Sequence, residues 1–137
     1  NPRLAKLARR LPICEEAGSG WDKIIRSCEL MQLPATEIQE SRGDAPSMRV
    51  RLMQRRPYRD LTVDERLQAC YWHACLQYAN GNALTNASLR ERFGLPTSSS
   101  SQISRLIADA ISDRLIRPVD ADAANKKMRY IPAWVGE

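Results

Sequence analysis

Residues 83–118 read ALTNASLRERFGLPTSSSSQISRLIADAISDRLIRP, which predicts a short helix, a turn and a longer helix, followed by a strand. Thr85 or Asn86 can cap a first helix, because a side-chain oxygen there accepts from an otherwise unpaired backbone N–H. Gly94 suits a left-handed exit from that helix, and Pro96 cannot continue it. The serine run Ser98–Ser101 can cap a second helix, whose apolar stripe at helical spacing is formed by Ile103, Leu106, Ile107, Ala110 and Ile111. The pattern predicts a helix-turn-helix.

A further helix is predicted before this motif, from Thr62 to about Tyr78. Thr62 and Glu65 have the spacing of a capping box. The core stripe of this helix is expected to be Val63, Leu67, Cys70, Tyr71, Ala74 and Tyr78. His73 falls on the polar side and is expected at the surface. The apolar surface extends well past one face, through Trp72, Cys75 and Leu76.

A helix that is apolar around so much of its circumference normally packs against other elements on two sides. The element that packs on the second side is either the N-terminal half or another copy of the chain. We therefore expect a homodimer, with Trp72, Cys75 and Leu76 as its candidate interface.

After the motif, the sequence predicts a β-hairpin. Residues 115–119 and 128–132 are its strands, and Asp120–Lys127 is the connecting wing. Ala83-Leu84 can add a short strand, and Trp134 is expected to pack back on the domain. The whole stretch from Thr62 to Trp134 thus has the layout of a winged helix.

The N-terminal half predicts two helices and two strands. The first helix begins at Asn1-Pro2 and ends at Pro12, and the second begins near Gly20 after the loop Gly18-Ser19-Gly20. That loop can present backbone N–H groups to a phosphate, although a Gly-x-Gly pattern also serves as an ordinary turn. Residues 37–41 and 47–53 are predicted to be two strands, followed by a linker at about 54–60. In the second, Met48, Val50 and Leu52 alternate with Arg49 and Arg51, the pattern of a half-buried strand.

These elements predict an α+β fold that is mainly helical. It divides into a partial segment at 1–56 and a winged helix-turn-helix domain at 57–137. The first residue is Asn and not Met, so we expect upstream domains that this chain lacks.

The net charge of +5 is compatible with a nucleic-acid partner but does not require one. Five arginines and no acid lie within residues 49–59, so the basic excess is upstream of the helix-turn-helix. No apolar run is long enough to span a membrane, and we expect a cytoplasmic protein. The cysteines lack metal-ligand spacing, and residue sets for catalysis are missing, so we expect no metal, no cofactor and no enzymatic activity.

Two stretches resemble a bacterial arrangement. Residues 1–5, 16–25 and 33–35 (NPRLA, EAGSGWDKII and LPA) resemble the end of the "RecG C-terminal-like" domain, a divergent relative of the GHKL ATP-binding fold. Residues 62–66, 84–94, 104–107 and 128–132 resemble the C-terminal winged helix of the same group, in which a Schlafen/AlbA-type domain comes first. The resemblance implies a transcriptional regulator. The GHKL motifs for Mg²⁺ and ATP are absent, so it does not imply ATP binding.

The first functional hypothesis is binding of double-stranded DNA through the winged helix. Arg105 can read guanine and Gln102 adenine if the second helix enters the major groove. Phosphate contacts are expected from hydroxyl and amide groups at the two helix N-termini and from the wing: Thr85, Asn86, Ser99, Ser100, Ser101, Lys126, Lys127 and Arg129.

Two alternatives remain open. One is a winged helix that binds protein through its apolar first helix, and the other is a nucleotide-sensing regulator. Asp109 weakens the DNA hypothesis, because it lies four residues after Arg105 and can pair with it.

Overall fold

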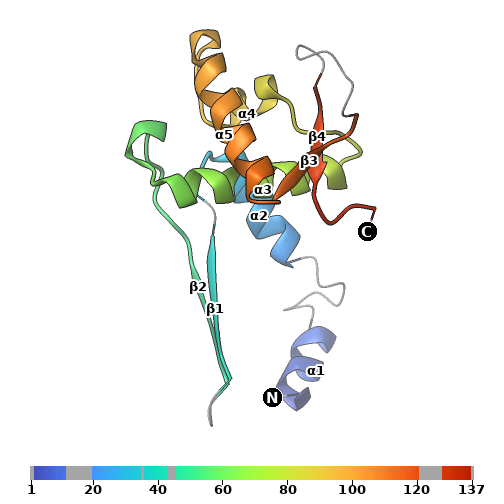
Figure 1. Ribbon diagram of the computed structural model, residues 1–137. Helices are drawn as coiled ribbons and strands as arrows, with labels where there is room; N and C mark the ends of the chain where they lie inside the picture. Colours follow the sequence, from blue (N-terminus) through green and yellow to red (C-terminus); the bar gives the residue numbers. More distant parts are fainter. Residues whose placement is uncertain (1, 12–19, 35, 43–45, 121–127, 137) are drawn as a thin grey trace.

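The computed structural model describes residues 2–11, 20–34, 36–42, 46–120 and 128–136 (Figure 1). Its elements follow in the order α1 (Pro2–Arg10), α2 (Gly20–Leu30), β1 (Glu37–Ser41), β2 (Ser47–Arg51), η1 (Tyr58–Asp60), α3 (Val63–Ala79), α4 (Asn86–Arg92), η2 (Thr97–Ser99), α5 (Ser100–Ser112), β3 (Ile116–Pro118) and β4 (Tyr130–Pro132). The predicted α+β class with a helical majority is confirmed.

Helix α3 is the central element, with α5 above it and most of α2 below it in the view of Figure 1. The main core lies where α3, α4, α5 and the β3–β4 pair meet, and its fully buried members include Cys70, Leu84, Leu89, Ile103 and Ala110. The predicted α5 stripe is buried at four of its five positions. Ile111 is the exception at 36% exposure, because it lies at the edge of the stripe.

The predicted α3 stripe is correct in the middle of the helix and wrong at its ends. Leu67, Cys70 and Ala74 are buried. Val63 and Tyr78, in the first and last turns of the helix, are exposed. The predicted capping box is confirmed: Thr62 Oγ1 accepts from the Glu65 N–H, and the Thr62 N–H donates to Glu65. This second bond is the main reason that the pKa of Glu65 is lowered.

The helix-turn-helix stretch forms the predicted helices with an extended connection. Thr85 caps α4 through a reciprocal pair of bonds with Ser88, and Gly94 takes the left-handed conformation at φ +64°. The serine run does not cap α5 by a side chain. The 3₁₀ turn η2 leads directly into α5, so Ser99 has a nearly helical backbone (φ −83°, ψ 10°) and not the extended one from which a cap reaches inward.

The predicted C-terminal hairpin is present as β3 paired antiparallel with β4, in the register Ile116–Pro132. Leu84 adds an antiparallel bridge to Tyr130, as expected for Ala83-Leu84. Trp134 packs edge-on against Tyr78 with the ring centres 5.8 Å apart. Residues 121–127 of the wing lie outside the described part of the chain.

Strands β1 and β2 form an antiparallel ribbon that extends away from the helices (Figure 1). The prediction of half-buried strands is wrong here. Met48 and Val50 share one face with Ile38, yet they are 66% and 41% exposed. Apolar and charged residues alternate along β2 as in a strand that packs on one face, but none of the described elements packs against that face.

The predicted linker is partly structured. Tyr58 is buried and lies edge-on to Phe93, with 4.9 Å between the ring centres. The guanidinium of Arg66 lies 4.4 Å from the centre of the Tyr58 ring. This tyrosine therefore attaches the chain before α3 to the core.

Candidate functional site

The outward face of α5 carries three of the predicted DNA contacts. Ser101, Gln102 and Arg105 are all exposed, on the side of the helix away from the buried stripe. None of the ion pairs among the described residues includes Arg105, so the predicted pairing with Asp109 is not formed in that part of the chain. The Arg105 guanidinium is therefore open to a ligand in solvent.

Two of the predicted phosphate contacts, Asn86 and Ser100, form hydrogen bonds that join α4 to α5. The Asn86 Nδ2 group donates to the Ser100 carbonyl at 2.9 Å and to the Ser104 hydroxyl at 3.0 Å. Its Oδ1 accepts from Arg90 Nε at 2.9 Å and from the Ser100 hydroxyl at 3.2 Å. The side chain of Asn86 thus fixes the angle between the helices, a role that the sequence did not reveal.

The other predicted contacts are those of the wing (Lys126, Lys127 and Arg129) and of the loop Gly18-Ser19-Gly20. Arg129 is exposed immediately before β4, at the end of the β3–β4 hairpin that leads into the connecting segment. Arg117 of β3, which pairs with Ile131 in the strand register, donates through Nη2 to the Val135 carbonyl at 2.7 Å and holds the C-terminal turn. Lys126, Lys127, Gly18 and Ser19 lie outside the described residues, whereas Gly20 is the first residue of α2.

The arginine-rich stretch 49–59 is largely engaged within the chain. Arg51 pairs with Glu37 at 3.1 Å and Arg59 with Asp60 at 3.5 Å, while Arg56 pairs with Glu65. Arg55 donates to the Gln32 side chain. These partners reduce the positive charge that the stretch can offer to a polyanion.

A buried charge cluster joins α2, α3 and α4. Glu29, His73 and Arg92 are only 9%, 7% and 6% exposed. Arg92 donates to Glu29 Oε1 through Nε at 3.2 Å and through Nη2 at 3.0 Å. His73 Nδ1 lies 3.1 Å from Glu29 Oε2 and must be the donor, because a carboxylate only accepts. The prediction of a surface His73 is wrong, because α2 lies over that side of α3.

The same junction carries two further polar ties. Arg92 also donates to the Leu33 carbonyl, and Gln32 Nε2 donates to the Glu91 carbonyl at 3.1 Å. No sequence pattern indicates this cluster, because Glu29 is 44 residues from His73 and 63 from Arg92. The three side chains also line a cavity of about 360 Å³ between α2, α3 and α4. Their bonds to one another hold α2 against α3 and α4.

Cys70 adjoins this cluster and is chemically inert. Burial raises the pKa of its thiol to about 12; Glu29 raises it further and Arg92 lowers it. The thiol is therefore protonated at neutral pH and is a poor nucleophile. Among the described residues, no group of three or more His, Cys, Asp or Glu side chains is placed to hold a metal ion.

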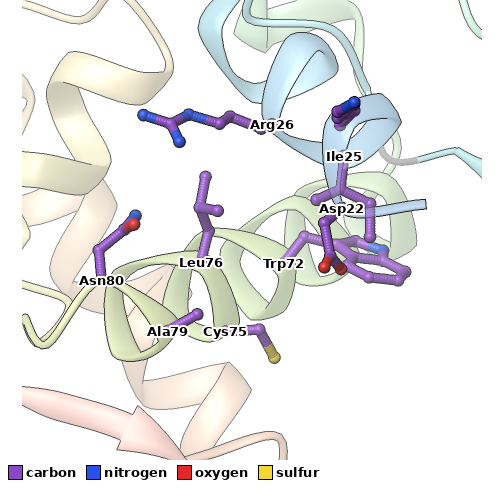
Figure 2. Close-up of a pocket in the computed structure, with 9 residues that line it drawn as sticks. Asp22, Ile25, Arg26, Trp72, Cys75, Leu76, Ala79 and Asn80 are labelled. Carbon is purple, nitrogen blue, oxygen red and sulfur yellow. The ribbon is translucent and has the colours of Figure 1, made fainter. Parts of the chain in front are cut away.

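A cavity of about 490 Å³ lies between α2 and α3 (Figure 2). The three residues named as a candidate dimer interface, Trp72, Cys75 and Leu76, help to line it and are partly buried. Helix α2 supplies the opposite side through Asp22, Lys23, Ile25 and Arg26. One side of the wide apolar surface of α3 is thus faced by the N-terminal half, the first of the two covers considered.

Comparison with known proteins gives one match. Residues 1–52 match the family described as "Putative ATP-dependent DNA helicase recG C-terminal", a stretch that comprises α1, α2, β1 and β2. The RecG C-terminal-like resemblance is thereby supported for this part of the chain. No curated protein and no solved structure matches. None of the described helices is long and apolar enough to cross a membrane.

Proposed function

We propose that α3, α4, α5 and the β3–β4 hairpin form a winged helix that binds duplex DNA, as part of a transcriptional regulator. The order of the elements supports this proposal, since three helices are followed by a two-stranded hairpin that carries a bridge to Leu84. Helix α5 would enter the major groove, and the hairpin would lie along the neighbouring backbone.

The open face of α5 carries the proposal. Arg105 is exposed and has no ion pair among the described residues, and Gln102 lies three residues before it on the same face. A guanidinium can donate two bonds to guanine, and a glutamine amide can pair with adenine. Arg129 in the hairpin would add a phosphate contact.

The electrostatic part of the binding is expected to be modest. Arg105 is the only base on the outward face of α5, and the arginines of 49–59 are mostly paired. Sequence-independent binding grows with the number of phosphates that basic side chains neutralise. We therefore expect weak binding to random duplexes that falls as salt rises.

Fluorescence anisotropy with a random duplex over a salt series tests the proposal. Arg105→Ala is expected to weaken binding about fivefold or more at low salt, because it removes about 1 kcal/mol or more of contact energy. Arg49→Ala is the matched control, since it removes the same charge from an exposed position on β2, away from α5 (Figure 1). Equal losses for the two variants, or no binding at low salt, would contradict the proposal.

Association with a second copy of the chain is the second candidate, and the β1–β2 ribbon favours it. An isolated two-stranded ribbon is marginal in water. Ile38, Met48 and Val50 share one exposed face, which also holds Glu40 opposite Met48, paired with Arg42 at 3.2 Å. Glu37 and Arg51 pair on the other face. Two ribbons can therefore meet on the apolar part of this face without separating the Glu37–Arg51 pair.

Light scattering tests this second candidate. The chain is expected to be a dimer at high concentration, and Val50→Asp to be a monomer with unchanged helix content by circular dichroism. Val63→Asp, at an exposed valine at the start of α3, is the control and should remain dimeric. A monomeric parent chain would remove the homodimer from the proposal.

A further inference from the structure

The cavity between α2 and α3 has the size and lining of a small-molecule site. Its volume of about 490 Å³ lies within the range of roughly 300–1,000 Å³ that such sites occupy. It is separate from the outward face of α5, because its lining comes from α2, α3 and the residue that caps α3, Asn80. Its ligand is therefore independent of the proposed DNA contact.

The body of the cavity is apolar. Figure 2 shows the Trp72 ring at one end and Leu76 pointing into the space between the two helices. Ile25 of α2 and Ala79 of α3 complete this part. A flat aromatic body fits such a lining, because an indole face and aliphatic side chains favour contact with a ring.

The opposite end is polar and basic. Figure 2 shows Arg26 reaching across from α2 toward Asn80, with its guanidinium away from Trp72. Arg26 is exposed, and it takes part in none of the hydrogen bonds or ion pairs formed between described residues. Asp22 is at the Trp72 end, in the first turn of α2, where the helix dipole favours a carboxylate.

We propose that this cavity binds a small aromatic carboxylate. The ring lies against Trp72 and Leu76, and the carboxylate accepts from Arg26 and from the Asn80 amide. A guanidinium matches a carboxylate by two parallel bonds, and a charge-assisted pair is stronger than a neutral one. A carboxylate placed at the Trp72 end would be repelled by Asp22, so the ligand binds with its carboxylate at the Arg26 end.

Calorimetry on the full chain with 2-naphthoate and its neutral analogue 2-naphthamide tests the proposal. The carboxylate is expected to bind one molecule per chain, about tenfold or more tighter than the amide. Arg26→Gln should lower the affinity for 2-naphthoate to that for the amide. Arg49→Gln removes an exposed charge from β2 and should leave both affinities unchanged.

A second variant tests the place of binding. Ala79→Trp should abolish binding of both compounds, because Ala79 lines the cavity and is itself exposed, so the larger side chain fills the space without entering the core. In the unmodified chain, the indole N–H signal of Trp72, assigned by its loss in Trp72→Phe, should shift on addition of 2-naphthoate. This measurement does not depend on the folding of Ala79→Trp.

Three results would overturn the proposal. The first is no saturable binding of 2-naphthoate up to its solubility limit. The second is equal affinity for the carboxylate and the amide. The third is binding that neither Arg26→Gln nor Ala79→Trp changes, with no shift of the Trp72 signal, which would place the compound on another apolar surface such as the leucines of α1.

Discussion

Glu29→Ala is expected to lower the free energy of unfolding by about 3–5 kcal/mol, the largest effect of any single substitution considered. The Glu29 carboxylate accepts two bonds from Arg92 and one from His73, all within a buried junction. Its removal leaves the Arg92 guanidinium without a counter-charge away from water. The loss of unfolding free energy comes mainly from the unpaired charge of Arg92, and only in small part from the lost hydrogen bonds.

The chain contains a matched control for this prediction. Glu37 pairs with Arg51 at 3.1 Å, nearly the 3.0 Å of the Glu29–Arg92 pair, but both partners are largely exposed. Glu37→Ala should therefore cost only about 0–1 kcal/mol, because water replaces the partner. Urea unfolding followed by circular dichroism measures both variants, and the double replacement Glu29→Met with Arg92→Met should recover part of the loss.

Similar small losses for Glu29→Ala and Glu37→Ala would show that the junction is open to water. A loss for the double replacement as large as the sum of its two single replacements would also contradict the account. In that case the stranded charge would not be the main cost.

Ile103→Ala is expected to cost about 2–5 kcal/mol of stability. Ile103 is fully buried in the core between α3, α4 and α5, so its truncation removes apolar contacts and leaves a void. Ile111 lies two turns further along the same helix and is 36% exposed. Ile111→Ala should cost about 1 kcal/mol or less, because less area is lost and solvent fills the space.

The two isoleucine variants have the same change in helix propensity, so their difference isolates the effect of burial. Thermal and urea unfolding give that difference directly. If Ile111→Ala proved as costly as Ile103→Ala, the edge of the α5 stripe would have to be covered, for example by a second copy of the chain.

Local structure was largely predictable from the sequence. The capping box at Thr62, the cap at Thr85 and the left-handed Gly94 each depend on neighbours within a few residues, and all three are present. The α5 stripe was predictable because helical period alone separates its core face from its outward face. That same separation placed Arg105 and Gln102 on the surface.

Local sequence patterns did not predict burial at the ends of helices, or burial caused by packing between distant segments. The periodicity of α3 extends to Val63 and Tyr78, but whether a partner reaches that far depends on where α5 lies. The alternation of β2 correctly predicts a strand with one apolar face, yet it cannot supply the cover for that face. His73 has polar neighbours along its helix, so only the position of α2 shows that it is buried.

The helices, their caps, the hairpin and the outward face of α5 in the stretch 83–118 and its flanks were predictable, because each follows from interactions among near neighbours. The packing of the helices, in contrast, brings Glu29, His73 and Arg92 into one cluster, lets Asn86 join α4 to α5, and forms the cavity between α2 and α3. These features join residues far apart in the chain. Their side chains come into contact only when the helices pack, and local sequence patterns do not predict that packing.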